Sequence, residues 1–213
     1  MKLPEPLQLS EPGAARDQRA APRFALLLRI AKLVDAKGEM LCIVRDVSTS
    51  GVRLRLFHPL PRDGEPLALE NADGTRFGLE QVWERDGEGG FRFVHPVAVD
   101  AFIADAGVHP RRAVRLAVDH QVAIVVGGDE VAGTLRNISR QGARLDTELR
   151  LPLGMRLRFG SSLLPTMEAT VCWRRYPWHG VVFTQVLTLE ELALRSLRLR
   201  GRDPGEPQPT LLG

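Results

Sequence analysis

The chain contains only two cysteines, Cys42 and Cys172, among its 213 residues. Both lie inside apolar runs. The chain contains an internal repeat of about ninety residues, and a disulfide framework would have been duplicated with it, but the two cysteines occupy non-equivalent positions of this repeat. We therefore expect both to be small buried hydrophobic residues in a reducing cytoplasm. A membrane-spanning helix needs about 18 consecutive apolar residues, and no stretch of the sequence comes close to that length. The N-terminal segment also lacks the apolar core of a signal peptide. We expect neither export nor membrane insertion.

Lysine is scarce, because it occurs only at positions 2, 32 and 37, and arginine supplies the other 26 of the 29 basic residues. The 26 acidic residues leave a formal net charge of +3. This balance, together with a lack of interleaved exposed aromatic residues, argues against a nucleic-acid partner. For most of the arginines a genome that favours arginine codons is explanation enough, so only those in a defined motif indicate a function. In the expected C-terminal helix, we expect a solvated face for Arg195, Arg198, Arg200 and Arg202.

Patterns typical of enzymes and metal sites are absent from the sequence. The histidines are scattered without metal-ligand spacing, and there is no paired-carboxylate, Cys-His, Ser-His or Walker-type arrangement. Ser48 and Ser139 have no general base nearby in the sequence. We therefore expect no catalytic residue, no enzyme activity, no bound metal and no cofactor.

The chain does contain one pattern twice: two arginines four residues apart and then, a little over twenty residues later, Asp or Asn-x-Ser-x-x-Gly. The first copy consists of Arg19, Arg23, Asp46, Ser48 and Gly51, and the second consists of Arg111, Arg115, Asn137, Ser139 and Gly142. The copies are offset by 92 residues at the arginines and by 91 at the serines. A Trp followed by Gly-x-x-Phe also recurs, at Trp83 and Trp173. Such matched landmarks indicate a tandem duplication of a domain of about ninety residues.

The hydrophobic pattern of each copy is typical of short antiparallel strands. Apolar residues alternate along 116–126, and Gly127-Gly128-Asp129 supplies a turn before the return strand. Five or six such strands per copy predict a mainly all-β chain with two small antiparallel β-barrels, each followed by a short helix. For the second helix, Thr188 and Glu191 predict a capping box. We expect a disordered arm at 1–15, barrel domains at 16–106 and 107–202, and a disordered tail at 203–213.

These residues resemble the pattern of the PilZ domain family, whose members bind the bacterial second messenger cyclic di-GMP. The resemblance rests on Arg19 to Arg23 with Asp46 to Gly51, and on Arg111 to Arg115 with Asn137 to Gly142. It covers residues 16 to 186 and implies two tandem PilZ domains. It also implies a set of ligand-binding residues, namely Arg19, Arg23, Asp46, Ser48, Gly51, Arg111, Arg115, Asn137, Ser139 and Gly142.

The residue types suit such a ligand. Arginine forms forked hydrogen bonds both with phosphate oxygens and with the O6 and N7 edge of guanine. Asp46 or Asn137 can accept hydrogen bonds from guanine, Ser48 and Ser139 can donate or accept them, and glycine permits close backbone approach or a positive φ. The competing interpretation is a strand exit with a turn, because Asn, Asp, Ser and Gly all favour turns.

The two copies depart from the family pattern in different ways. Pro22 stiffens the first arginine loop, and Asn137 removes the acid from the second copy. We expect both copies to keep binding residues, with the second the better candidate because its strand alternation is cleaner. The resemblance implies a cytoplasmic bacterial cyclic di-GMP receptor that signals to an unknown downstream protein. The alternative is a ligand-free PilZ-like module for protein interaction.

Overall fold

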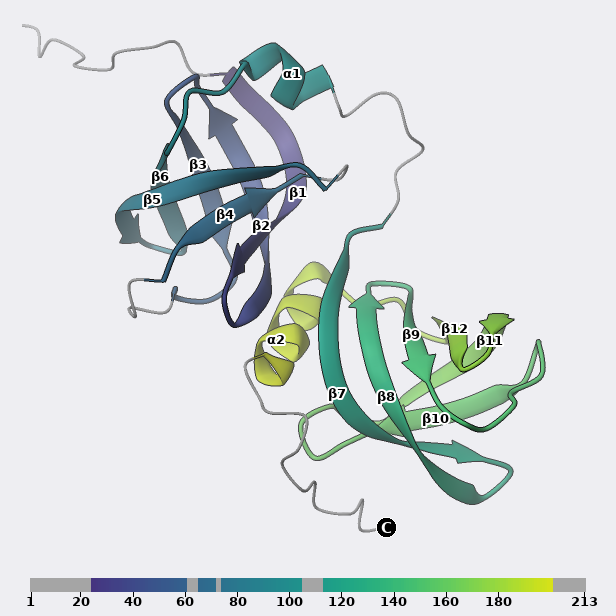
Figure 1. The fold of residues 1–213 in the computed structure, drawn as a ribbon. Coiled ribbons are helices and arrows are strands. Elements are labelled where there is room, and N and C mark those ends of the chain that lie inside the picture. Colours follow the sequence, from purple (N-terminus) through teal and green to yellow (C-terminus); the bar gives the residue numbers. More distant parts are fainter. Residues whose placement is uncertain (1–23, 61–64, 72–73, 105–112, 201–213) are drawn as a thin grey trace, which may run out of the picture.

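The computed structural model describes residues 24–60, 65–71, 74–104 and 113–200, and it has two β-barrels with a helix after each (Figure 1). The first barrel contains β1 (Phe24–Asp35), β2 (Gly38–Val47), β3 (Gly51–Leu56), β4 (Leu67–Glu70), β5 (Arg76–Arg85) and β6 (Glu88–Phe93), followed by α1 (Val99–Ala104). The second contains β7 (Arg115–Val126), β8 (Asp129–Ser139), β9 (Gly142–Asp146), β10 (Arg156–Gly160), β11 (Met167–Arg175) and β12 (Trp178–Phe183), followed by α2 (Leu189–Leu199).

Both barrels are closed and have the same antiparallel topology. The strand order is β1-β2-β3-β6-β5-β4 in the first barrel and β7-β8-β9-β12-β11-β10 in the second. Register shifts also recur at equivalent places, just before Asp46 and Asn137 and just before Trp83 and Trp173. The predicted all-β fold with two small antiparallel barrels is confirmed. The expected arm and tail lie outside the described residues.

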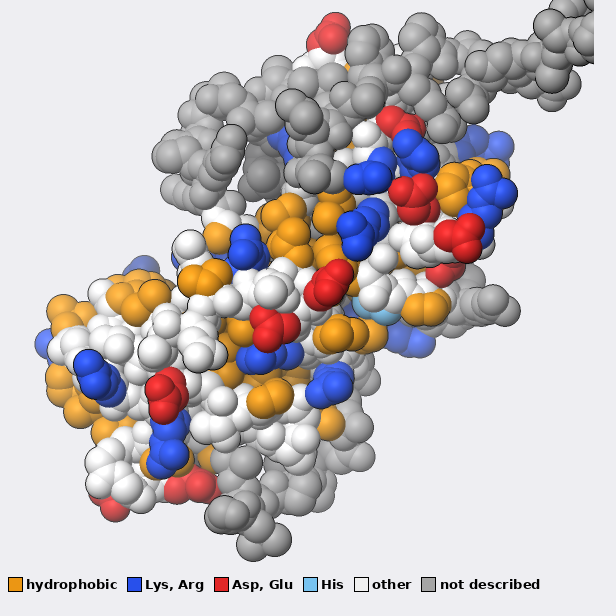
Figure 2. Space-filling model, turned by 180° about the vertical axis from the view of Figure 1, so that it is seen from behind, with side chains coloured by type: hydrophobic (Ala, Val, Ile, Leu, Met, Phe, Trp, Pro, Cys, Tyr) orange, Lys and Arg blue, Asp and Glu red, His pale blue; other side chains and the backbone are white. Residues whose placement is uncertain are grey.

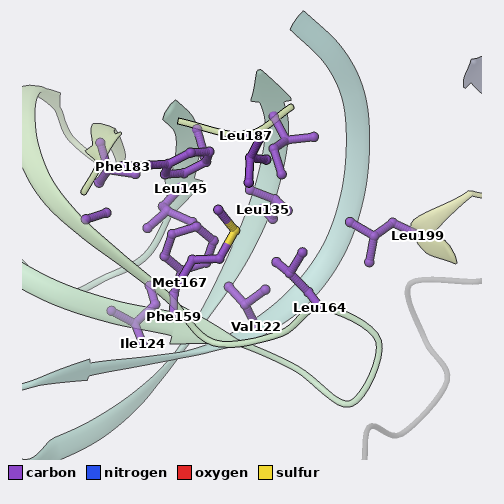
Figure 3. Close-up of a cluster of buried hydrophobic side chains, with 14 of the residues drawn as sticks. Val122, Ile124, Leu135, Leu145, Phe159, Leu164, Met167, Phe183, Leu187 and Leu199 are labelled. Carbon is purple, nitrogen blue, oxygen red and sulfur yellow. The ribbon is translucent and has the colours of Figure 1, made fainter. Parts of the chain in front are cut away.

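Each barrel is filled by side chains of alternating strand residues. In the first barrel Phe102 of α1 packs against Phe77 and Phe93, with ring centroids 5.3 and 6.3 Å away. In the second, Phe159 and Phe183 lie 6.2 Å apart at their centroids. Figure 3 shows these two rings among aliphatic side chains of several strands, with Leu199 of α2 at the side of the cluster. Each copy thus has its own core, as expected for a duplicated domain.

Helix α2 begins with the capping box that the sequence predicts. The Thr188 hydroxyl accepts a hydrogen bond from the Glu191 amide at 3.1 Å, and the Glu191 carboxylate accepts one from the Thr188 amide at 2.8 Å. These bonds satisfy two amides that a helix start leaves free. Leu192, Ala193 and Leu199 are buried, so the apolar face of the helix covers the second barrel.

The two barrels meet through α2 and the hairpin of β1 and β2, which lie next to each other in Figure 1. Leu41 of β2 is buried within the second barrel's hydrophobic cluster, and Ile30 and Phe57 pack against that cluster. The Glu39 carboxylate accepts a hydrogen bond from the Ala117 amide of β7 at 2.7 Å. The first barrel is therefore attached to β7, the strand that begins with Arg115.

No helix within the described ranges is long and apolar enough to cross a membrane. Cys42 is buried as expected, and burial raises the pKa of its thiol. The expectation for Cys172 is wrong, because this residue is exposed on β11. Cys172 is the extra residue at the register shift between Val171 and Trp173, where the alternation of buried residues along β11 breaks off.

Candidate functional site

Seven of the ten predicted ligand-binding residues lie in the described part of the chain. Arg19, Arg23 and Arg111 lie outside it. Arg115 begins β7 and is the register partner of Ser139, so the second motif and its second arginine are neighbours on adjacent strands. The remaining motif residues are on β2 and β8, at the starts of β3 and β9, or in the turns between them.

Both motif serines build the turn that joins these strands. The Ser48 hydroxyl accepts a hydrogen bond from the Gly51 amide at 3.1 Å and donates one to the Gly51 carbonyl at 3.2 Å. Ser139 and Gly142 repeat both bonds at 3.2 and 2.9 Å. Both serines are buried, so their hydroxyl groups have a structural role in the turn. The contribution of these hydroxyls to ligand binding stays a prediction.

The motif glycines are required by close backbone approach. A Cβ atom at Gly51 would lie 2.6 Å from the Phe91 carbonyl oxygen, and one at Gly142 would lie 2.2 Å from the Val181 carbonyl oxygen. Neither glycine has a positive φ. Glycine is therefore needed at these positions for close backbone approach and not for a positive φ. The turn is thereby held against the neighbouring strand.

One row of paired residues crosses each barrel at the motif. In the first barrel Asp46 pairs with Arg53, Arg53 with Gly90, and Gly90 with Trp83. Paired residues of neighbouring strands carry side chains on the same face of the sheet. The register shift before Asp46 and that before Trp83 bring both residues into the row.

The same row in the second barrel consists of Asn137, Arg144, Gly180 and Trp173. In both rows the indole lies directly over the glycine, because a Cβ there would be 2.0 Å from the Trp83 Nε1 atom or 1.9 Å from the Trp173 Nε1 atom. The glycine therefore leaves the space that the indole fills. Both tryptophans are rim residues, because Trp83 is half-buried and Trp173 is exposed.

The arginine of the first row is neutralised within the barrel. The Arg53 Nε donates to the buried Asp46 carboxylate at 2.6 Å, and its Nη1 donates to Glu88 at 3.4 Å. Arg45 lies 3.5 Å from the same Glu88. A phosphate arriving at Arg53 would have to compete with two carboxylates that are already in place.

The arginine of the second row has neither acid. Asn137 stands in place of Asp46, and Trp178 stands in place of Glu88. The Arg144 guanidinium lies 5.5 Å from the centroid of the Trp178 ring, and its buried Nε has no hydrogen-bond partner within the described residues. A buried guanidinium N–H without an acceptor is costly, and an anionic ligand would satisfy it.

Arg53, Arg144, Glu88 and Trp178 were not predicted as site residues. Arg53 and Arg144 carried a usable signal, because each stands two residues after the motif glycine in both copies. Glu88 and Trp178 carried none, since they are distant in sequence and reach the arginines only through strand pairing. In the described part of the chain, no group of His, Cys, Asp and Glu side chains could hold a metal ion.

The second barrel matches a known family. The model of the PilZ domain matches residues 109–198. This PilZ match includes Arg111, Arg115 and the motif from Asn137 to Gly142, the whole second barrel and most of α2. It leaves out the first barrel, which has the same strand order. No curated protein matches the chain.

Several solved structures are distantly similar to the chain. PlzA of Borreliella burgdorferi in complex with c-di-GMP is 12% identical, with 81% of this chain and 88% of that chain covered and a TM-score of 0.35. The inhibitor of motility MotI/DgrA of Bacillus subtilis is 12% identical, with 82% and 96% covered and a TM-score of 0.35. YcgR of Escherichia coli in complex with c-di-GMP is 14% identical, with 80% and 81% covered and a TM-score of 0.29.

Proposed function

We propose that the chain is a bacterial cyclic di-GMP receptor and that its second barrel carries the stronger site. The observation that supports this ranking is Arg144, whose buried Nε has no acceptor among the described residues and lies beside the neutral Asn137. It belongs to the barrel that the PilZ family matches. In this proposal Arg111, Arg115 and Arg144 bind phosphate or guanine, and Asn137 accepts from a guanine edge.

The first barrel is proposed to bind more weakly, through Arg19, Arg23 and Asp46. The Asp46 carboxylate and Glu88 already hold Arg53, so a phosphate gains less there. This proposal keeps the expected order, with the second copy as the better site, and gives it a different physical reason, the charge around each arginine. The closed network of Asp46, Arg53 and Glu88 also favours the alternative function for this barrel, a protein-interaction module without ligand.

The signal would leave through the contact between the barrels. Arg115 begins β7, and two residues later the Ala117 amide donates to Glu39 of the first barrel. A ligand that draws Arg115 toward the motif therefore acts on the same strand end that holds the first barrel. We propose that a cytoplasmic protein partner senses the resulting change in barrel packing. The function is binding and requires no turnover.

Calorimetric titration of the full chain with cyclic di-GMP tests this proposal. The Arg115→Ala and Arg144→Ala variants are each expected to weaken the tighter binding event about ten- to a hundredfold, the usual effect of losing one charge-assisted contact. Arg53→Ala is the matched control in the first barrel, and it should leave that event within about twofold. Absence of binding at micromolar nucleotide, or loss of the tighter event in Arg53→Ala, would contradict the proposal.

A further inference from the structure

The hairpin tips of the two barrels have diverged in chemistry. The β5–β6 tip reads Glu84-Arg85-Asp86-Gly87-Glu88, and the equivalent β11–β12 tip reads Arg174-Arg175-Tyr176-Pro177-Trp178. The strand pairing on both sides is the same, with Arg85 opposite Glu88 and Arg175 opposite Trp178. Three acids in the first tip are thus replaced by one arginine and two aromatic residues in the second.

The fold does not require these aromatic residues. Asp86 and Gly87 of the first tip have φ values of 52° and 71°, which suit a two-residue hairpin turn, so an acidic tip closes the same hairpin. In the second tip Tyr176 and Trp178 are 52% and 39% exposed. Large aromatic side chains that stay in water at a turn contribute little to a core. They therefore point to a binding role.

Each of the two exposed rings has an arginine beside it. The Arg144 guanidinium is 5.5 Å from the Trp178 ring centroid, and the Arg150 guanidinium is 5.3 Å from the Tyr176 centroid. Arg174 and Arg175 are exposed on the same hairpin. We call this set the hairpin surface; it consists of Arg144, Arg150, Arg174, Arg175, Tyr176 and Trp178. Figure 2 shows basic and hydrophobic side chains side by side at the outer edge of the second barrel.

The acids near the hairpin surface already have partners. Asp146, the register neighbour of Trp178, accepts a hydrogen bond from Arg136 at 2.9 Å. Glu148 accepts one from the Tyr176 hydroxyl. The four arginines of the hairpin surface form no ion pair with a carboxylate within the described ranges. The local excess of positive charge is therefore available to an anionic partner.

We propose that the hairpin surface binds single-stranded nucleic acid. Exposed aromatic rings stack with unpaired bases, and arginines contact the backbone phosphates and stack on bases themselves. A protein partner would not require exposed aromatic rings and arginines that alternate along one turn. We therefore replace the expectation that nucleic acid is excluded, because the hairpin supplies the exposed aromatic residues on which that expectation depended. The hairpin surface shares Arg144 with the proposed cyclic di-GMP site, whereas Tyr176, Arg174 and Arg175 lie outside that site.

Fluorescence anisotropy with a labelled oligothymidylate of about 20 nucleotides tests it on the full chain. The wild-type protein is expected to bind, and its affinity should fall roughly fiftyfold between about 50 and 200 mM salt if four phosphates are neutralised. The double variant Tyr176→Leu with Trp178→Leu keeps every charge. It should bind the oligonucleotide at least about tenfold more weakly and bind inorganic polyphosphate unchanged.

A second variant exchanges the tip for that of the first barrel. It combines Arg174→Glu, Tyr176→Asp, Pro177→Gly and Trp178→Glu, a sequence that already closes the equivalent hairpin in this chain. It should abolish oligonucleotide binding, whereas the matched control Arg85→Ala in the first tip should not affect it. Wild-type protein that fails to bind the oligonucleotide at about 50 mM salt, or a Leu variant that binds it unchanged, would overturn the proposal.

Cyclic di-GMP titrations separate this proposal from the proposed function. Arg115→Ala is expected to weaken cyclic di-GMP binding about ten- to a hundredfold and to keep oligonucleotide binding, because Arg115 lies outside the hairpin surface. Tyr176→Leu alone should weaken oligonucleotide binding and keep the affinity for cyclic di-GMP. A common loss of both ligands in either variant would contradict the assignment of two separate sites.

Discussion

Arg200, just after α2, forms an ion pair with Asp35 of the first barrel, and the two side chains are only 7% and 1% exposed. Arg200 was expected to lie on a solvated helix face, so this contact is a correction. The helix position alone could not reveal it, because the partner is on the other barrel. The pair joins the β1–β2 hairpin to the end of the chain's last described helix.

Replacing Arg200 should therefore weaken the contact between the barrels. Arg200→Met leaves the Asp35 carboxylate buried without its cation, which typically costs about 3 to 5 kcal/mol. Urea unfolding followed by tryptophan fluorescence should show a lower midpoint for the transition that includes this contact. Arg198→Met, at an exposed position of the same turn, is the control and should leave the midpoint unchanged. Equal midpoints in both variants would show that the buried pair contributes nothing to the packing of the barrels.

Trp178→Glu should convert the second site toward the first. The new carboxylate would stand where Glu88 stands beside Arg53 and would pair with Arg144, so cyclic di-GMP affinity should fall about tenfold or more. Val186→Glu adds the same charge at an exposed position outside the row and should change the affinity less than threefold. Titration calorimetry measures both. An unchanged affinity in Trp178→Glu would mean that Arg144 does not contact the ligand.

The two barrels could be predicted from the sequence because strand alternation, turn residues and a repeated motif are local signals. The alternation along 116–126 corresponds to β7, and the Thr188 and Glu191 pair corresponds to the cap of α2. Features that depend on pairing between distant strands were not predictable. Glu88 and Trp178 reach their arginines only through the register of β3 with β6 and of β9 with β12. The charge difference between the two sites therefore needed the structure.

Gly142→Ala should be strongly destabilising even though φ is not positive at this position. The added methyl would lie 2.2 Å from the Val181 carbonyl oxygen, a backbone atom that cannot move without disturbing β12. Overpacking of this kind costs about 1 to 3 kcal/mol. Gly78→Ala is a milder comparison, because its nearest neighbour is the side chain of Val94 at 3.1 Å. Thermal unfolding should show a larger fall in Tm for Gly142→Ala, and equal falls would contradict the proposed close approach.

His179 should make the second barrel less stable as the pH falls below neutrality. Burial lowers the pKa of this imidazole, an effect that the nearby Arg174 reinforces, and its Nε2 accepts a hydrogen bond from the Leu151 amide at 3.4 Å. An acceptor nitrogen must be unprotonated. The unfolded chain, with an ordinary histidine pKa of about 6.5, therefore takes up the proton first.

The stability that depends on neutral His179 is thus fully present above about pH 6.5 and is lost as the pH falls toward the lowered folded pKa. The slope should approach about 1.4 kcal/mol per pH unit, and urea unfolding between about pH 7.5 and 5.5 measures it. His179→Asn should be less stable at neutral pH but should lose this slope. His95→Asn, at an exposed position, should keep it. A slope that persists in His179→Asn would assign the pH dependence to another group.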